Sequence, residues 1–572
     1  MRPVPLVVAI AAATLMSELP TAQVPGDRPA PNPRSTRSVV MARNGLIATS
    51  QPLASAAGLQ VLREGGNAID AAVAAAAVLS VVEPTMNGVG GDLFALVYDP
   101  KSGELQGLNA SGRSAYAATP EVFAERGLKE IPYRGVLSVT VPGVVDAWAT
   151  LLDRYGTIPL SRALAPAIEY ASRGFPVSEI ISWQWKSTSD VLSADRAAAA
   201  TFLPGGHAPE PGDIFANPRL ADTLRKIASG GRDTFYRGPI AEAIVADIRA
   251  RGGLLEARDF AGHRSEWVDP ISTSYRGHDV FELPPNTQGF VALEILNILE
   301  GYDLKALGHN SAAYLHLLVE AKRIAFADRD RYLADAEAVP PGFLAKVLSK
   351  SYAAERRKEI DPARAARSYT PARLGPGMSP TLSNRPTFEA SGDTVYLTAA
   401  DGKGHVISLI QSLFESFGAG IVAGETGIAL QNRGSLFTLD PRHPNRIAAH
   451  KRSLHTLVPA MVLKGGRPFL SFGVMGGDMQ PQGHVQVVAN LVEFGMNVQE
   501  AGEAPRFRHT AAGLALESAI SPEARFGLNK RGHRLLDSVG VFGGFQGILI
   551  DRTTGVLMGG SDPRKDGLAI GY

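Results

Sequence analysis

A long proline-rich segment divides this sequence into two parts with different patterns. Residues 369–388 hold four prolines, with Gly, Ser and Asn between them, and show no hydrophobic period. Such a segment predicts a long exposed loop. Helical spacing dominates residues 145–365 before it, and short strand-like runs follow it. We therefore expect a helix-rich first part joined by a loop to a compact, strand-rich second part.

Apolar periodicity predicts the elements on either side of this loop. A helix is expected over residues 52–64 because Gly65-Gly66 can end it in the left-handed conformation. The almost wholly apolar run 68–82 predicts a buried core helix, since it is too short to span a bilayer. Strands are expected at 94–98, 105–108, 395–400, 406–413, 457–463 and 469–472, and further helices at 315–333 and 485–492.

The composition excludes several classes of function. The 572 residues are 45% hydrophobic and 20% charged, with a net charge of +1, which is typical of a globular protein and gives no basic surface for nucleic acid. The absence of cysteine excludes a thiol nucleophile and thiolate metal ligands. The twelve histidines show no reliable metal-ligand spacing. We predict no metal and no cofactor.

The first residues are typical of an export signal. Arg2 supplies a positive charge, residues 6–16 form an apolar run, and small polar residues follow. We predict a signal peptide over residues 1–25 and a flexible tether over 26–38. The protein is then expected in the periplasm or outside the cell, with no membrane span after processing.

Thr394 is the candidate nucleophile. A polar loop runs through Gly392 and Asp393 directly into a strand that begins at this threonine. If the bond between Asp393 and Thr394 breaks, Thr394 gains a free α-amino group with a pKa near about 8, which can take the proton of its own hydroxyl. Taken alone, a threonine at this position is also compatible with an ordinary β-strand.

A wider set of motifs supports the catalytic interpretation. From about residue 38 to Tyr572 the chain resembles the γ-glutamyltransferase family in the order and spacing of its motifs. The motifs are Gly65-Gly66-Asn67-Ala68-Ile69-Asp70-Ala71-Ala72, Gly90-Gly91-Asp92, Thr394, Asp401-Gly402-Lys403-Gly404-His405, Ile421-Val422-Ala423-Gly424-Glu425-Thr426-Gly427-Ile428, Gly476-Gly477 and Ala504-Pro505-Arg506-Phe507.

The resemblance implies a fold, a maturation step and catalytic roles. The fold would be the α/β four-layer αββα sandwich of the N-terminal-nucleophile hydrolases. Self-cleavage would give a large subunit, 39–393, and a small subunit, 394–572, which stay together as a heterodimer. Thr394 would be the nucleophile, the Ser412 hydroxyl would bond to it, and the backbone N–H groups of Gly476 and Gly477 would hold the oxyanion.

The expected substrate pocket departs from the glutathione-processing members. Phe414 stands where they have an asparagine, Leu436 where they have an aspartate, and His455-Thr456 where they have two serines. A leucine cannot bind an ammonium group, and losing that carboxylate should weaken recognition by about 2–5 kcal/mol. We therefore expect γ-glutamyl donors to be handled poorly.

Two arginines remain as partners for a substrate carboxylate. Ser111 stands at the family's arginine position, with Arg113 two residues further on. Arg433 adds a second planar fork that suits a carboxylate, although a surface ion pair is an equal alternative for it. Asn432, His455 and Thr456 are further candidate binding residues. The pattern is similar to the family's divergent branch, which includes oxamate amidohydrolase and acylases.

The sequence leaves three functions open. The family's general activity is hydrolysis or transfer of a γ-glutamyl group from a glutathione-type amide, through an acyl-enzyme on Thr394. The alternative within the class is a non-glutamyl amidohydrolase or acylase, similar to oxamate amidohydrolase or cephalosporin acylase. A processed binding protein without turnover is the alternative from another class, but the intact Thr394, Ser412 and glycine pair argue against it.

Overall fold

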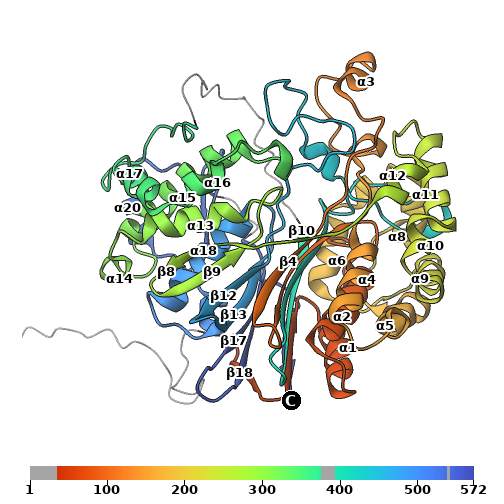
Figure 1. Ribbon diagram of the computed structural model, residues 1–572, viewed down its shortest axis with the longest axis horizontal. Helices are drawn as coiled ribbons and strands as arrows, with labels where there is room; N and C mark the ends of the chain where they lie inside the picture. Colours follow the sequence, from red (N-terminus) through yellow and green to blue (C-terminus); the bar gives the residue numbers. More distant parts are fainter. Residues whose placement is uncertain (1–34, 375–392, 538–541) are drawn as a thin grey trace, which may run out of the picture.

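Two β-sheets lie face to face between two layers of helices. The computed structural model describes residues 35–374, 393–537 and 542–572. Figure 1 shows the sheets side by side in the centre, with helices from the first part of the chain on one outer face and helices from the middle and the end on the other. The predicted signal peptide and most of the predicted tether and loop lie outside the described residues.

Each sheet contains seven strands, and the strand pairs of both sheets are antiparallel. The first sheet has the order β19 (Leu568–Gly571), β2 (Gly45–Thr49), β10 (Asp393–Asp401), β11 (Val406–Phe414), β3 (Asp92–Asp99), β4 (Glu104–Ala110), β7 (Glu266–Val268). The second has the order β1 (Val40–Ala42), β18 (Leu557–Ser561), β17 (Phe545–Ile550), β13 (Arg467–Val474), β12 (Ala460–Lys464), β9 (His278–Glu282), β8 (Ile271–Tyr275).

Burial on both faces explains why the central strands are apolar without strict alternation. On β10, Val395 and Leu397 pack toward the helices, whereas Tyr396 packs between the sheets. Phe94 of β3 and Ile410 of β11 join Tyr396 in the core between the sheets. Thr394 therefore lies at the start of a central strand that is covered on both sides.

The helices of the two outer layers cover opposite sheets. Helix α2 packs on β10 and β11, while α18 and α19 pack on β13 and β17. All fifteen residues of α2 are buried, and Asn67 caps its N-terminus in a capping box with Asp70. The main layer helices are α1 (Pro52–Arg63), α2 (Ala68–Val82), α4 (Val144–Tyr155), α5 (Leu160–Arg173), α13 (Gly289–Leu299), α15 (Ala312–Tyr332), α18 (Met479–Val492) and α19 (Val498–Glu503).

Shorter elements surround this sandwich. They are α3 (Pro120–Glu125), α6 (Glu179–Lys186), α7 (Ser189–Ser193), α8 (Arg196–Phe202), α9 (Pro218–Gly230), α10 (Arg232–Tyr236), α11 (Pro239–Ala250), α12 (Ala257–Gly262), α14 (Leu304–Leu307), α16 (Phe343–Val347), α17 (Lys350–Arg357), α20 (Pro522–Lys530), β5 (Phe175–Pro176), β6 (Ile214–Phe215), β14 (Phe507–His509), β15 (Leu514–Leu516) and β16 (Leu535–Leu536).

The four-layer αββα prediction is confirmed, and most of the expected elements are present within a few residues of their expected bounds. The main difference lies in the region 145–365, which was expected to be dominated by helices but also supplies β7, β8 and β9. Arg276 and Gly277 turn β8 into β9 with φ values of 49° and 76°. Two consecutive positive φ angles are typical of a tight hairpin turn.

Candidate active site

Thr394 and Ser412 lie next to each other on the two central strands of the first sheet. The Thr394 hydroxyl donates to Ser412 Oγ at 3.4 Å, and the Phe414 backbone N–H donates to the same oxygen at 2.7 Å. The pairing of β10 with β11 shifts register between Asp393 and Val395, so the strand is irregular at the predicted cleavage bond. Thr394 is 1% exposed. This geometry fits a nucleophile that has a hydroxyl partner, and the catalytic role stays a prediction.

The Gly476-Gly477 turn joins β13 to α18. Both glycines have positive φ, 111° and 58°, which most L-residues avoid. A Cβ on Gly476 would come within 3.3 Å of Gly543 Cα and of Met479 Cβ. The Gly476 carbonyl accepts the Met479 N–H at 2.9 Å. Because the C=O and N–H of a trans peptide point in opposite directions, the Gly477 N–H points away from α18.

Arg433 is a buried charge with one side-chain hydrogen-bond acceptor, the Thr456 hydroxyl, among the described residues. It is 1% exposed, its Nη1 donates to Thr456 Oγ1 at 2.7 Å, and its Cζ lies 4.5 Å from the centre of the Phe414 ring. Its Nε and Nη2 are buried without a hydrogen-bond partner in the described parts of the chain. Burial lowers the pKa of Arg433 to about 9, although Asp92 and Glu415 oppose the shift. The guanidinium is thus charged at neutral pH, with two donor nitrogens left for an acceptor.

Phe414 links Arg433 to the threonine-serine pair. Its backbone bonds to Ser412, while its ring lies against Arg433. Its φ is 82°, a conformation that costs a non-glycine residue roughly 1–3 kcal/mol. Strain of this kind is typical of functional sites, where surrounding contacts hold it in place.

Asp92 and His455 form a buried pair beside Arg433. His455 Nδ1 accepts the Leu457 N–H at 3.2 Å, so a neutral ring carries its proton on Nε2 and donates it to Asp92 at 3.2 Å. Gly112 N–H also donates to Asp92, at 2.9 Å. Burial raises the pKa of Asp92 to about 7, against the opposing charge of Arg433. Burial, reinforced by Arg433, keeps the pKa of His455 well below its ordinary value.

Two of the predicted binding residues, Arg113 and Asn432, have partners within the protein. Arg113 forms ion pairs with Glu266 at 3.0 Å and Asp335 at 3.3 Å. Asn432 donates to the Tyr133 carbonyl at 2.9 Å and accepts the Glu415 N–H at 3.2 Å. Side-chain and backbone contacts therefore join one region, and the ion pairs of Arg113 do not connect its side chain to it. The region comprises Thr394, Ser412, Phe414, Arg433, His455 and Thr456.

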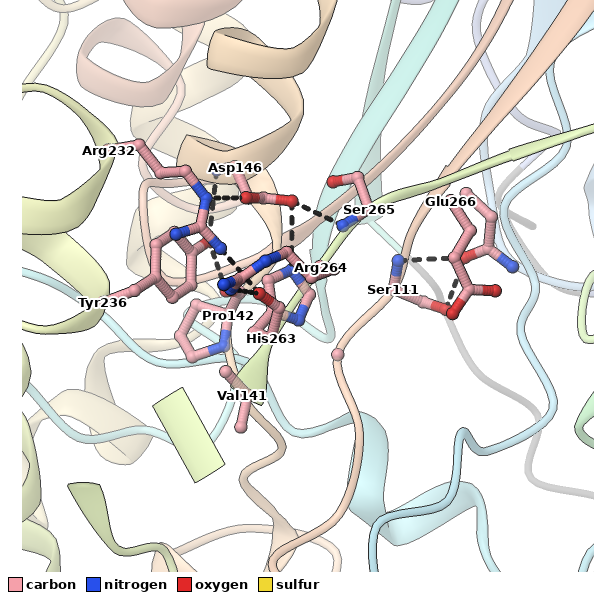
Figure 2. A network of polar contacts seen from close by, with 12 residues as sticks. Ser111, Val141, Pro142, Asp146, Arg232, Tyr236, His263, Arg264, Ser265 and Glu266 are labelled. Carbon is pink, nitrogen blue, oxygen red and sulfur yellow. Dashed lines mark hydrogen bonds and ion pairs between the residues drawn. The ribbon is translucent and has the colours of Figure 1, made fainter. Parts of the chain in front are cut away.

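A separate polar network lies at the edge of the first sheet (Figure 2). The Asp146 carboxylate accepts from Arg232 and from the Ser265 N–H, and the His263 ring lies 3.9 Å from it. Tyr236 stacks on His263 with ring centres 5.1 Å apart. Burial lowers the pKa of His263 to about 3, although Asp146 opposes the shift. The network ties the start of α4 to the segment before β7, which indicates a structural role.

One group of side chains has the composition of a metal site. His316, Glu320 and His533 are buried close together in the described residues. However, His316 bonds to His533 at 2.7 Å and to the Asp361 carbonyl at 2.8 Å. Glu320 accepts from three partners: Arg323, the Ala366 N–H and the Tyr369 hydroxyl. These bonds occupy the ligand atoms, so the group is a hydrogen-bonded cluster.

No helix within the described ranges combines the length and the apolarity that a membrane crossing requires.

The fold and the site together define the class. Two face-to-face antiparallel sheets between helical layers, with a threonine at the start of a central strand, are typical of N-terminal-nucleophile hydrolases. The family described as Gamma-glutamyltranspeptidase matches residues 54–572, and the chain belongs to this family. It is accordingly an enzyme with amide hydrolase or acyltransferase activity, related to proenzymes.

Several relatives cover nearly the whole chain. A glutathione hydrolase-like YwrD proenzyme from Bacillus subtilis is 39% identical, over 93% of this chain and 99% of its own. An oxamate amidohydrolase proenzyme from Klebsiella pneumoniae is 36% identical, over 92% and 98%. The crystal structure of a cephalosporin acylase from Bacillus halodurans superposes with a TM-score of 0.87 at 43% identity, over 96% and 99%.

The sequence did not single out three residues that border the site. Asp92 is part of a sequence motif, while Glu415 and Gln288 lie outside every motif of the sequence. Gln288 donates from Nε2 to the carbonyls of Thr456 at 2.9 Å and Gly477 at 3.1 Å. Gln288 follows residues 284–287, a turn-like run inside a region expected to be helical. This run was the sequence signal that could have pointed to Gln288.

Proposed function

We propose that this protein matures by cutting itself before Thr394 and then cleaves amides whose acyl group ends in a carboxylate. The observation that carries this proposal is Arg433, a buried cation with two nitrogens that have no partner among the described residues, linked to the Thr394–Ser412 pair through Phe414. A planar guanidinium fork matches a carboxylate, and an unpaired buried charge is costly until such a partner binds.

Each step has a group suited to it. The free amine of Thr394 takes the hydroxyl proton, Oγ1 attacks the amide carbon, and the carbonyl oxygen becomes an oxyanion. The N–H groups of Gly476 and Gly477 would stabilise this oxyanion. The amine leaving group departs with the proton, which leaves an ester on Thr394. Water, or an acceptor amine in a transfer reaction, then releases the acyl group and restores the hydroxyl.

The pocket favours an acyl group without an α-ammonium. Leu436 packs in an apolar cluster with Phe414, and Asp92 already accepts hydrogen bonds from Gly112, Gln431 and His455. Burying an unpaired ammonium there would cost several kcal/mol, so discrimination against it should exceed about 100-fold. Glutaryl-type donors therefore fit better than γ-glutamyl donors.

A γ-glutamyl donor is the second candidate because of one residue. Glu415 lies close enough to Arg433 to oppose the lowering of its pKa. A carboxylate at this place could receive the α-ammonium in place of the aspartate that Leu436 replaces. The relatives include both glutathione hydrolases and an acylase, so a γ-glutamyl donor and a glutaryl donor both need to be tested.

Maturation would give two subunits, and an export signal would set the location of the enzyme. The large subunit would comprise residues 39–393 and the small subunit 394–572, held together as a heterodimer by the mixed strands of both sheets. Residues 1–25 would direct export, with 26–38 as a tether, which would place the mature enzyme in the periplasm or outside the cell. Its partners would be small amide or peptide substrates.

Intact mass and N-terminal sequence of the purified protein test the maturation. We expect a new chain that begins at Thr394, and we expect Thr394→Ala to stay uncut because alanine has no hydroxyl to attack the Asp393 carbonyl. Ser412→Ala is the matched variant that keeps the nucleophile but removes its partner. An active wild-type enzyme that remains a single uncut chain would refute the proposal.

A pair of chromogenic anilides tests the substrate. The glutaryl and γ-glutamyl anilides differ only in the α-ammonium group, so the ratio of their kcat/KM values isolates its effect. We expect the glutaryl compound to be better by about 100-fold. A much higher kcat/KM for the γ-glutamyl anilide would favour the second candidate, with Glu415 as the partner of the α-ammonium group. Glu415→Gln should then reduce only the γ-glutamyl activity.

A further inference from the structure

The Gly476-Gly477 turn is attached to the rest of the site by a buried clamp. Gln288 is 1% exposed, and its Nε2 donates to the Gly477 carbonyl at 3.1 Å and to the Thr456 carbonyl at 2.9 Å. Thr456 in turn holds Arg433 through its hydroxyl at 2.7 Å. One amide group therefore connects the glycine turn to the segment that positions the buried arginine.

Arg329 sets the orientation of this amide. Its Nη1 donates to Gln288 Oε1 at 2.9 Å and to Asp478 Oδ1 at 2.7 Å. Because a guanidinium is only a donor, the Gln288 oxygen must face Arg329, and the Gln288 nitrogen must face the two carbonyls. Burial opposes ionisation of Asp478, but Arg329 nevertheless brings the pKa of Asp478 below its ordinary value.

The clamp acts on the peptides that flank the two glycines. The Gly477 carbonyl belongs to the peptide that leads into Asp478. It accepts from Gln288 and from the Gln480 N–H at 3.2 Å, and Arg329 binds the Asp478 side chain next to it. Before the turn, the Met475 N–H bonds to the Gly544 carbonyl at 2.9 Å. Glycine has the widest choice of backbone angles, so two consecutive glycines keep one conformation only when their neighbours are fixed.

We propose that Gln288, oriented by Arg329, is a positioning residue for the reaction of this enzyme. It holds the Gly476-Gly477 N–H groups in the direction that an oxyanion requires, at a fixed distance from the Arg433–Thr456 subsite. It does not touch the substrate. The inference rests on the proposed role of the glycine pair, but it does not depend on which acyl donor the enzyme prefers.

The prediction is a loss of turnover with little change in substrate binding. Donors aimed at the oxyanion act mainly in the transition state, so misplacing them lowers kcat. Removing one such donor typically costs about 100-fold to 1,000-fold in turnover. A clamp that merely stabilised the fold would lower the melting temperature and the amount of active enzyme, without changing kcat per processed active site.

Gln288→Glu is the sharpest substitution because it keeps the shape of the side chain and its bond to Arg329. It removes both hydrogen-bond donors and places an oxygen against two carbonyl oxygens. Gln486→Glu is the matched control. Gln486 is also buried and donates to two backbone carbonyls, of Gln482 at 3.0 Å and Phe507 at 3.2 Å. It lies in the middle of α18, away from the Gly476-Gly477 turn.

The experiment measures kcat and KM, per Thr394 N-terminus, with whichever anilide the wild-type enzyme turns over. We expect Gln288→Glu to lower kcat by about 100-fold with KM within about threefold, and Gln486→Glu to keep kcat. Wild-type kcat in processed Gln288→Glu, or a raised KM with kcat unchanged, would overturn the proposal. If this variant does not fold, Arg329→Lys provides the same test, because lysine keeps a charge beside Asp478 but loses the fork that also reaches Gln288.

These results separate the clamp from the substrate assignment. A wild-type enzyme that prefers the γ-glutamyl anilide contradicts the glutaryl proposal, yet the kcat of Gln288→Glu still tests the clamp. Equal losses of kcat in Gln288→Glu and Gln486→Glu would also overturn the clamp, because the effect would then follow from burying a carboxylate at either position.

Discussion

Arg433 and Arg506 are both buried to 1% exposure, but their surroundings differ. Arg506 pairs with Asp562 at 2.9 Å and donates to the carbonyls of Phe542 and Gly502. Arg433 donates only to the Thr456 hydroxyl and leaves two nitrogens unpartnered within the described residues. Burial lowers the pKa of both, to about 9 for Arg433 and about 10 for Arg506.

Under the proposed function, this difference distinguishes Arg506, whose charge is satisfied within the protein, from Arg433, which would bind a substrate carboxylate. A buried charge that is satisfied within the protein stabilises a defined arrangement, whereas an unsatisfied one is tolerated where a substrate supplies the missing partner. Arg506 belongs to one of the family motifs, and Arg433 belongs to the part of the pocket that departs from the family pattern. The following substitutions test this contrast.

The largest effect on stability is expected at Arg506. Arg506→Met removes one partner of a buried ion pair and leaves Arg564, at 3.0 Å, as the remaining ion-pair partner of Asp562 in the described residues. Breaking a buried pair in this way should lower the free energy of unfolding by about 3 kcal/mol. Urea unfolding followed by circular dichroism measures the change. An unchanged urea midpoint would show that the Arg506–Asp562 pair does not stabilise the fold, which would contradict the contrast.

Arg433→Met should affect activity instead. Losing a buried fork for the substrate carboxylate should lower kcat/KM for the glutaryl anilide by about 100-fold. The free energy of unfolding should change by no more than about 1 kcal/mol, because the native guanidinium is itself poorly satisfied. A neutral acyl anilide is the control, since it has no carboxylate to lose. Equal effects on both anilides would place Arg433 outside the pocket.

Anion binding should depend on pH through Asp92. Burial raises the pKa of this carboxyl to about 7, with Arg433 opposing. Below pH 7 the carboxyl is neutral and leaves the Arg433 charge to the ligand, whereas above pH 7 it is ionised and competes with the ligand. The inhibition constant of pentanoate should therefore rise roughly threefold to tenfold from pH 6 to pH 8.

Asp92→Asn tests the origin of that pH dependence. An amide does not ionise, so the inhibition constant should become nearly flat over the same range. Because the amide nitrogen would face the His455 proton, the variant should first be checked for processing at Thr394. A variant that keeps the full pH dependence would assign it to another group.

The smallest effect is expected at Arg113. Its side chain is 19% exposed and pairs with Glu266, which is 48% exposed, and with Asp335. Partly exposed ion pairs contribute about 1 kcal/mol or less, so Arg113→Gln should change stability only slightly. Its kcat/KM for the glutaryl anilide should stay within about twofold of wild type. A loss as large as that of Arg433→Met would make Arg113 the carboxylate partner.

Local patterns were sufficient to predict many of the elements. Residues that are close in sequence predict helix α2 and the strands β10, β11 and β13. The hairpin of β8 and β9 was missed because its strands are short and half-buried, and because helices surround it in sequence. A strand is stabilised by its partners, and β9 pairs with β12, far along the chain.

The sequence by itself determined the family and predicted the nucleophile and the chemistry that Arg433 can offer, because these depend on residue types in order along the chain. Only the tertiary structure decided which buried arginine keeps two nitrogens without a hydrogen-bond partner among the described residues. Asp92 meets His455 across 363 positions, and Gln288 meets Gly477 across 189. Such contacts depend on how the sheets and their connecting segments pack, and no local periodicity encodes them.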